Sequence, residues 1–498
     1  MKKQIVSYLI ENNELVKPEI LERLKDPNTL KKAAKLVEEK AEAKQIIDVI
    51  KTNQAKEKET KETEHKQNNR DGEDEDKWAV KVLFDYEKPA LKKNVESFTK
   101  YFNNRFKQIE KLLLPRAENN ISISRLANKT DRETVTVIGM IADKQLTKTN
   151  KVILTLEDQT GTIKALFSPN NQETYKMAKD TVLDEVISVT GTAMKDLLFA
   201  EKMMLPEIPI RTEIKKSPEE AYAIFIADVH LGSNLFLEEE FGNFIDWLRG
   251  EYGTEEQKEI AKKTKYCFIA GDLVAGVGIY PKQEEELKIT DIYQQYKQFT
   301  EYIKKIPTNI KVIIIPGNHD AGRIAEPQPR IDKEFVEDLY DRPNIYLLSN
   351  PALVNIAATK EFEGFNVLLY HGYSYDYYSD NVESIRMSGK EISDRPVLVS
   401  KFLLQRRHLA PTHQSTLTMP DPEKDPLFIE TVPDIFVTGH IHKSAISSYR
   451  GTTIIAASSW EKQTSYQEKF GHKPDLCKVI AINLKTRKPT IIDFEQHQ

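Results

Sequence analysis

The stretch "VIIIPGNHDAG" (residues 312–322) decides the fold of the second half of this chain. Its four leading apolar residues predict a buried strand, and Pro316 and Gly317 end that strand. Asn318, His319 and Asp320 follow at once, which places an amide, an imidazole and a carboxylate in one short loop. Ligands bind at the carboxyl ends of strands in α/β sheets, so this loop is predicted to carry chemistry.

Four more apolar runs beyond residue 219 end abruptly in polar residues: "AYAIFIADVHLGS", "KYCFIAGDLV", "VLLYHGYSYD" and "DIFVTGHIHKS". Their alternation with helical stretches predicts an α/β domain at residues 219–498. A single histidine after an apolar run is usually a satisfied, partly buried ring. Five such strand ends in one domain favour a shared site instead, formed by Asp228, His230, Asp272, Asn318, His319, Asp320, His371, His440 and His442.

The spacing of these residues indicates metal binding. Asp228/His230 and His440/His442 are two apart, and in extended backbone such side chains project to the same side. Glycines at 271, 317, 372 and 439 permit tight turns or close backbone approach. Imidazole, carboxylate and amide donors suit Mn²⁺, Fe or Zn²⁺ better than a closed structural zinc site, which would use thiolates. There are too many donors for one tetrahedral ion, and two ions sharing a carboxylate would use them all.

The ordered set "DVH", "GD", "GNHD", "HG" and "GHIH" resembles the calcineurin-like metallophosphoesterase superfamily, which is an α/β sandwich. The resemblance implies that His319 faces the substrate as the catalytic acid and that Asp320 orients its ring. Two ions can position a phosphodiester, lower the pKa of a bridging water and stabilise the reacting oxygens. The implied metal ligands are Asp228, His230 and His442 for one ion, Asn318, His371 and His440 for the other, and Asp272 as the bridge.

The first half of the chain predicts smaller units. Residues 1–50 have helical apolar spacing and predict a small α-helical module, and 51–77 are so polar that a disordered charged linker is expected. Residues 78–130 predict a helical connector. Residues 131–212 change to short alternating strands with a hairpin turn at 157–162, and resemble an OB-fold β-barrel. Such barrels bind single strands or serve only as protein contacts, and both roles stay open.

This multidomain architecture resembles the small subunit of archaeal D-family DNA polymerase, a member of the polymerase B-subunit family. The resemblance implies a metal-dependent 3′–5′ exonuclease acting on DNA 3′ ends, with Mn²⁺ as the expected ion and a separate large catalytic subunit as partner. A sliding clamp is a further expected partner, although no convincing clamp motif is present. Two alternatives stay open: a scaffold with vestigial metal binding, and a stand-alone repair nuclease, whose usual plan places the phosphoesterase domain first.

Several remaining features concern partners and location. Arg406, Arg407 and His408 in "KFLLQRRHLAPTHQS" are expected DNA contacts, with surface or subunit-interface roles equally open. A net charge of −5 gives no global attraction to nucleic acid, and two cysteines cannot form a disulfide framework. The absence of a long apolar run and of a signal-like start predicts a cytoplasmic protein without membrane contact.

Overall fold

The computed structural model describes residues 77–90, 93–126, 133–194, 196–211, 213–390, 395–469 and 471–495, together with Ile5, Ala33 and Val37. The predicted helical module at 1–50 and the linker at 51–77 lie outside the described residues, apart from those three positions and Lys77. The chain divides into two compact units, Met1–Glu75 and Asp76–Gln498, and the fold described below belongs to the second.

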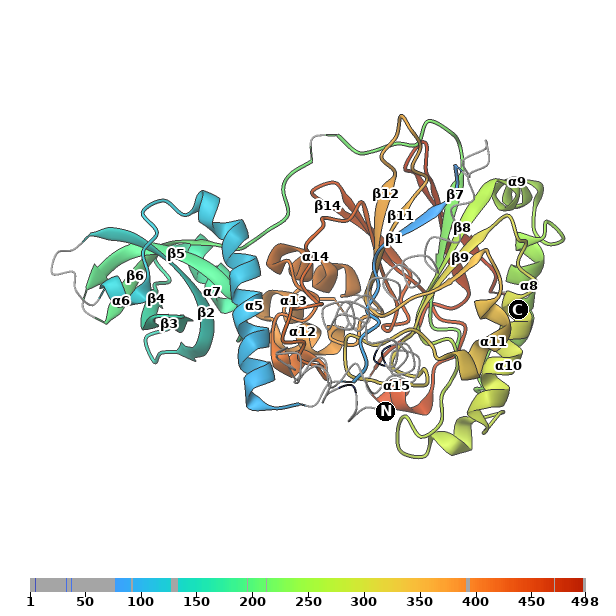
Figure 1. The fold of residues 1–498 in the computed structure, drawn as a ribbon, viewed down its shortest axis with the longest axis horizontal. Helices are drawn as coiled ribbons and strands as arrows, with labels where there is room; N and C mark the ends of the chain where they lie inside the picture. Colours follow the sequence, from blue (N-terminus) through green and yellow to red (C-terminus); the bar gives the residue numbers. More distant parts are fainter. Residues whose placement is uncertain are drawn as a thin grey trace. The chain divides into compact units, whose positions relative to one another are not determined.

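Two six-stranded sheets form the α/β part of this unit (Figure 1). The first has the order β10-β9-β8-β7-β16-β17, with strands Ile345–Leu347, Lys311–Ile315, Thr264–Ala270, Tyr222–Ile226, Lys478–Asn483 and Pro489–Asp493. The second has the order β1-β11-β12-β13-β15-β14, with strands Val80–Phe84, Ala352–Ile356, Phe365–Leu369, Ile435–Thr438, Thr452–Ala456 and Ala445–Tyr449. Strands β7, β8 and β9 run parallel, as do β12 and β13.

The two-residue period of the strands sorts their side chains into separate cores. In β8, Phe268 faces the core between the two sheets, whereas Cys267 and Ile269 face the core under the helices. Both cysteines are free and buried, as small apolar residues would be. Because the inner strands β7, β8, β9, β12 and β13 are apolar on both faces, the sheets must be covered on both sides, and this accounts for the uninterrupted apolar runs in the sequence.

Helices complete the layers. The outer face of the first sheet packs against residues of α8, α10 and α11, and the outer face of the second against residues of α12 and α14. Helix bounds in this part are α8 Glu238–Leu248, α9 Glu255–Lys263, α10 Ile292–Ile303, α11 Lys333–Tyr340, α12 Tyr375–Asn381, α13 Glu383–Arg386, α14 Pro396–Arg406 and α15 Ser465–Lys469. No helix among the described residues is long and apolar enough to cross a membrane.

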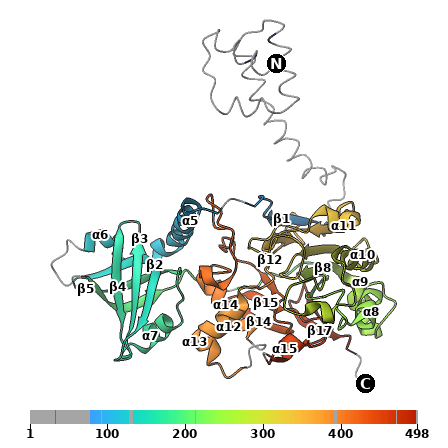
Figure 2. The same cartoon turned by 90° about the horizontal axis from the view of Figure 1, so that it is seen from below.

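A closed barrel of five strands, in the order β2-β3-β4-β6-β5, occupies the stretch where short alternating strands are expected. The predicted hairpin turn joins β3 to β4, and Figure 2 shows α7 beside the barrel strands. The barrel encloses its own apolar core. Element bounds are β2 Thr134–Leu146, β3 Val152–Asp158, β4 Gly161–Phe167, α7 Gln172–Lys179, β5 Val186–Met194 and β6 Leu197–Met204.

The segment before the barrel differs in part from the predicted helical connector. Helix α5 (Val95–Leu113) is present, with a 3-10 turn at Leu114–Arg116 and the short α6 (Ile123–Leu126) after it. Residues Val80–Phe84, however, form strand β1, which pairs antiparallel with β11 at the edge of the second sheet. The prediction of a purely helical segment is therefore wrong at these residues, because pairing with a strand far along the chain overrides the local pattern.

Helix α5 is joined to the sandwich by a buried ion pair. Arg105 donates from Nε to Asp425 Oδ2 at 2.7 Å and from Nη1 to the carbonyl oxygen of Pro411 at 2.5 Å. Burial alone would raise the pKa of Asp425, but His408 and Arg105 hold it well below its usual range. A buried carboxylate matched in this way fixes α5 against the loops that follow α14.

Candidate metal centre

The polar residues predicted at the strand ends do converge. Strands β7, β8 and β9 are parallel neighbours, so the residues that follow them reach the same edge of their sheet. Strands β12 and β13 bring His371, His440 and His442 to the matching edge of the other sheet. The centre is thus assembled from loops of both sheets.

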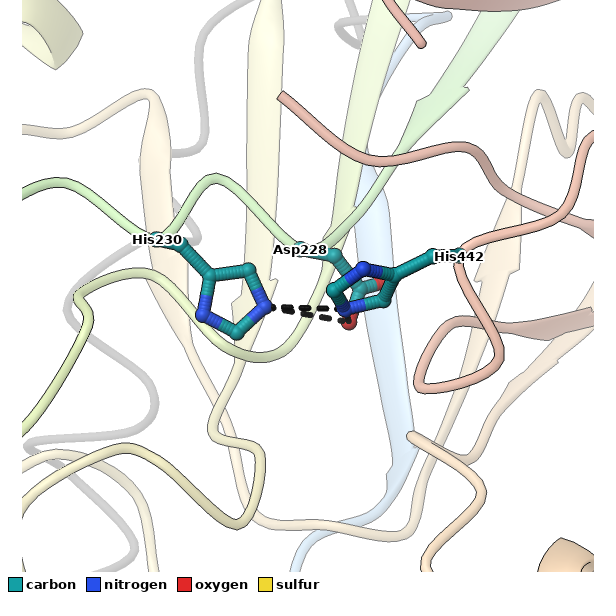
Figure 3. A group of neighbouring side chains, drawn as sticks. All are labelled: Asp228, His230 and His442. Atoms are coloured by element: carbon teal, nitrogen blue, oxygen red, sulfur yellow. Dashed lines mark hydrogen bonds and ion pairs between the residues drawn. The ribbon is translucent and has the colours of Figure 1, made fainter. Parts of the chain in front are cut away.

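The first group of donors is Asp228, His230 and His442 (Figure 3). The Nε2 atoms of the two histidines lie 3.0 Å apart, and His442 Nε2 lies 3.5 Å from Asp228 Oδ1. Two imidazole nitrogens that face each other this closely repel unless a proton or a metal cation lies between them. The rings and the carboxylate are all buried, so water cannot screen that repulsion.

The second group is Asp272, His371 and His440, with Asn318 among them. His371 Nε2 lies 3.0 Å from Asn318 Oδ1, and His440 Nδ1 lies 2.9 Å from the same oxygen. The other nitrogen of each ring has an acceptor of its own: His371 Nδ1 donates to the Ala270 carbonyl at 2.8 Å, and His440 Nε2 donates to Asp376 Oδ2 at 3.1 Å. In a neutral ring, the nitrogen that faces Asn318 presents a lone pair to an oxygen, so a proton or a metal cation is needed between the two atoms.

Asp272 lies between the two groups. Its Oδ2 atom is 3.8 Å from His230 Nε2 and 3.3 Å from His371 Nε2. One carboxylate is therefore close to a histidine of each group, as a bridging ligand must be. The nitrogen and oxygen donors of both groups fit divalent ions such as Mn²⁺, Zn²⁺ or Fe.

The electrostatics agree with this fit. Burial lowers the pKa of His442 to about 3, so its ring is neutral and can act as a ligand. Burial alone would also lower the pKa of His371, but Asp272 raises it to about 10 in the metal-free protein. A cation that binds there must displace that proton, so metal binding is expected to release protons.

Several residues that hold the ligands have no signal in the sequence. Gln467 Nε2 lies 2.9 Å from His442 Nδ1, and Asp376 accepts from His440 as described above. The carboxylate of Glu461 lies 4.0 Å from His230 Nδ1, and burial raises the pKa of Glu461 to about 8. The acceptor Asp376 fixes the tautomer and orientation of His440, and Gln467 orients the His442 ring. His230 Nδ1 has no hydrogen-bond partner among the described residues. Glu461 and Gln467 come from segments well after His442, and Asp376 comes from α12 shortly after His371; no spacing rule marks any of them.

The backbone of the ligands differs from the extended conformation that the two-residue spacing predicts. Asp228, His230, Asp272, His440 and His442 all have φ between 50° and 70°, in the left-handed region. Non-glycine residues rarely adopt this conformation, which costs about 1–3 kcal/mol each and concentrates at functional sites. The side chains converge because each loop turns sharply after its strand.

His319 and Asp320 are arranged differently from the prediction. The His319 ring lies 4.6 Å from the His230 ring, and its Nδ1 donates to the Ala275 carbonyl at 2.8 Å. Asp320 accepts from the backbone N–H of Gly317 at 2.8 Å and from the Tyr296 hydroxyl at 2.9 Å. The expectation that Asp320 orients the His319 ring is therefore wrong: Ala275 holds the ring, and Asp320 holds the loop.

The three predicted DNA contacts are also wrong as surface residues, because Arg406, Arg407 and His408 are 4%, 5% and 1% exposed. Arg406 donates to Glu185 at 3.1 Å, and Arg407 donates to the Ile429 carbonyl at 2.8 Å. His408 Nε2 lies 2.8 Å from Asp425 Oδ2. Their polar groups are hydrogen-bonded to partners inside the molecule. Sequence alone does not distinguish such residues from surface cations.

Comparisons with known proteins relate this chain to subunits of DNA polymerases. A family model that describes the B-subunits of DNA polymerases alpha and epsilon matches residues 223–447. The DNA polymerase II small subunit of Methanothermobacter thermautotrophicus is 38% identical over 385 residues, covering 77% of this chain and 76% of that protein. The corresponding protein of Archaeoglobus fulgidus is 38% identical over 397 residues, covering 80% and 77%.

A solved structure described as a novel archaeal phosphodiesterase aligns with 54% of this chain and 98% of its own, at 12% identity and a TM-score of 0.25. The identity to the two polymerase subunits extends over most of each chain, beyond the segment that carries the metal centre. The chain therefore belongs to the DNA polymerase II small subunit family.

Proposed function

We propose that this protein acts as the small subunit of a DNA polymerase and carries a two-metal 3′–5′ exonuclease that removes mismatched nucleotides from DNA 3′ ends. The observation that carries the proposal is the position of Asp272 between two groups of nitrogen and oxygen donors. Polymerisation would belong to a separate large subunit, as the names of the relatives imply.

Two divalent ions at this centre would position a phosphodiester, activate water and stabilise charge on the attacking and leaving oxygens. Mn²⁺ is the first ion to test, with Zn²⁺ and Fe as alternatives. The residues that would hold the ions are Asp228, His230 and His442 on one side, Asn318, His371 and His440 on the other, and Asp272 between them.

His319 is the acid in this proposal. Because its Nδ1 is engaged by the Ala275 carbonyl, the proton that it transfers is on Nε2. Its backbone N–H donates to Asp272 Oδ1 at 2.8 Å, which fixes the ring relative to the bridging carboxylate. A positioned acid of this kind contributes about 10²–10⁴-fold to rate.

The five-stranded barrel also fits a polymerase subunit that acts on DNA. Its second and third strands pair in a hairpin, its fifth strand lies between the third and the fourth, and α7 connects the third to the fourth. We infer that it is an OB-fold, whose members bind single strands or protein partners. A sliding clamp stays a predicted partner.

The proposal is tested with the purified chain, alone and with its large subunit, on a 5′-labelled primer-template with a 3′ mismatch. Mn²⁺-dependent shortening from the 3′ end is expected, and EDTA should stop it. In His319→Ala the rate should fall by about 10²–10⁴-fold while the metal content, measured by mass spectrometry, stays at the wild-type value.

Asp272→Asn is the contrasting variant, because it should lose both the metal and the cleavage. Loss of metal in His319→Ala would show that this ring is a ligand and not the acid. If neither the chain nor the two-subunit complex shortens the primer, the exonuclease proposal fails and the scaffold role becomes the better account.

A further inference from the structure

A groove beside the metal centre is not used by the assignments above. Its volume is about 570 Å³, within the ~300–1,000 Å³ typical of ligand sites. Its walls come from the residues at the start of α5, from the segment after His371 and from residues 413–418. The residues that matter below are Lys93, Phe98, Tyr373, Tyr377, His413 and Leu417.

The groove is continuous with the metal centre. Tyr373 lines the groove, and its ring lies 5.8 Å from the ring of His440. Asp376 also lines it and accepts from His440 Nε2 at 3.1 Å, so the one acidic side chain among the described wall residues is already engaged by a histidine. A strand with its terminal phosphodiester at the centre would therefore lead directly into this groove.

The wall combines aromatic rings with a free cation. Phe98 and His413 pack edge to face, 5.3 Å between ring centroids, and Tyr377 is half-buried close by. Leu417 leaves 56% of its surface exposed. Lys93 is exposed, and within the described part of the chain no carboxylate pairs with it. Aromatic surfaces for bases and a cation for the backbone are the usual composition of single-strand binding sites.

We propose that this groove binds the unpaired nucleotides at the end of a nucleic acid strand, with bases against Tyr377 and Phe98 and a phosphate near Lys93. The inference rests on the proposed function, because that function supplies the reason for a strand end at the metal centre. Bases within a duplex are stacked on one another and do not offer their faces, so the groove selects unpaired ends.

The test uses the full chain and a short fluorescein-labelled oligothymidylate, with binding followed by fluorescence anisotropy in EDTA so that no cleavage occurs. Tyr377→Ala and Phe98→Ala should each weaken binding by about 10- to 100-fold. Tyr377→Phe keeps the ring and should bind within about twofold of wild type. Tyr252→Ala is the matched control, because Tyr252 is 40% exposed in the loop between α8 and α9 and should have no effect.

Hydrolysis of bis(p-nitrophenyl) phosphate in Mn²⁺ is measured in the same proteins, because this small diester needs the metal centre but not the groove. Wild-type rates in Tyr377→Ala with weakened oligonucleotide binding support the inference. Unchanged oligonucleotide binding in both alanine variants overturns it. Equal loss for duplex and single strand also overturns it, as does loss of large-subunit binding with intact oligonucleotide binding. The groove assignment is judged by oligonucleotide binding, so weaker binding in the variants leaves it standing even if neither the chain nor the two-subunit complex shortens the primer and the proposed function fails.

Discussion

At Gly317 the backbone comes closest to the metal centre. A Cβ atom added there would lie 2.2 Å from Asp272 Oδ1 and 2.8 Å from His371 Cε1. Both contacts are far shorter than van der Waals distance, and both involve proposed ligands. Gly271 is similar, since a Cβ atom there would lie 2.4 Å from His371 Nδ1. Any side chain at these positions would overlap the proposed ligands. The glycines of the "GNHD" and "GD" motifs are therefore needed for close packing as well as for the backbone turn.

Gly317→Ala is expected to displace Asp272 and to lower the content of both metals together, with at least a 100-fold loss of cleavage. Metal content by mass spectrometry and the primer assay measure the two effects. Gly242→Ala is the matched control on α8, where nothing lies within 4 Å of the added methyl. That variant should keep its metal and become more stable by about 0.5–1 kcal/mol. Full metal content in Gly317→Ala would contradict the proposed bridge.

At this scale the sequence predicts which side chains meet but not how they are held. Asp228, His440 and the other predicted donors do lie together, because strand order brings all strand ends to one place. The carbonyls of Ala270 and Ala275 hold the His371 and His319 rings, and backbone groups have no sequence signal. Arg406 shows a different kind of error: the sequence predicts a surface contact to DNA, but the side chain is buried and paired with Glu185.

Among the loops, a buried polar network joins the segment after β9 to the segment before β11. Asn350 donates to Gln328 Oε1 at 2.6 Å and accepts from the His371 backbone N–H at 3.0 Å. Gln328 donates to the Gly317 carbonyl at 2.9 Å. Glu326 is fully buried beside them and accepts from the Tyr370 hydroxyl at 2.9 Å. The network therefore fixes the loop at Gly317 relative to the loop at His371.

Glu326 makes the stability of the metal-free protein depend on pH. Burial raises its pKa to about 7 from the ordinary 4.5, so the folded state favours the protonated form. This contribution is complete below about pH 4.5 and is lost as pH rises through about 7. Glu326→Gln removes this titration, so the variant does not lose this contribution as the pH rises. From pH 5 to pH 8 its free energy of unfolding should therefore increase by about 2–3 kcal/mol relative to that of wild type. Urea denaturation in EDTA at fixed ionic strength measures this, and parallel pH curves would contradict it.

Elements whose pattern is local are the ones that the sequence predicts well. The apolar spacing of α5 and the alternation and turn of β3 and β4 need no information from elsewhere in the chain. Strand β1 pairs with β11 through a register shift between Val82 and Phe84. Its five residues, between a charged segment and a helix, carry too little pattern to outweigh their neighbours.

For the molecule as a whole, the barrel and the sandwich share a buried charge pair. Arg406 and Glu185 have side-chain exposures of 5% and 1%. The Arg406 guanidinium also lies over the Phe402 ring, 3.4 Å from its centroid. Around them, the backbone N–H of Glu207 donates to the Gln405 carbonyl at 2.8 Å, and that of His413 donates to Asp184 at 2.8 Å. These contacts, together with Val182 packed among the sandwich residues of α12 and α14, couple the barrel to the sandwich.

Arg406→Met should destabilise the protein by about 3 kcal/mol, because Glu185 stays buried without its cation. The unfolding transitions of barrel and sandwich should also separate in calorimetry. Lys179→Met is the control within the same contact region, since Lys179 pairs with Glu383 at 29% and 41% exposure. That exposed pair is worth less than about 1 kcal/mol. If both variants lose the same free energy of unfolding, burial of the Arg406–Glu185 pair adds nothing to its contribution to stability.

The position of β1 fixes an order of events during synthesis. Val80 pairs with Ile356, so β1 leaves the ribosome long before its partner strand, and the complete barrel is made in between. The barrel can fold as a unit while β1 waits, since all five of its strands lie within 134–204. A chain that began at Ala221 would contain every proposed metal ligand but would leave β11 as an uncovered sheet edge, open to pairing with other chains. In sequence the barrel is therefore an insertion within the sandwich. The second sheet is completed only when β1 pairs with β11, which closes a long loop that contains the barrel.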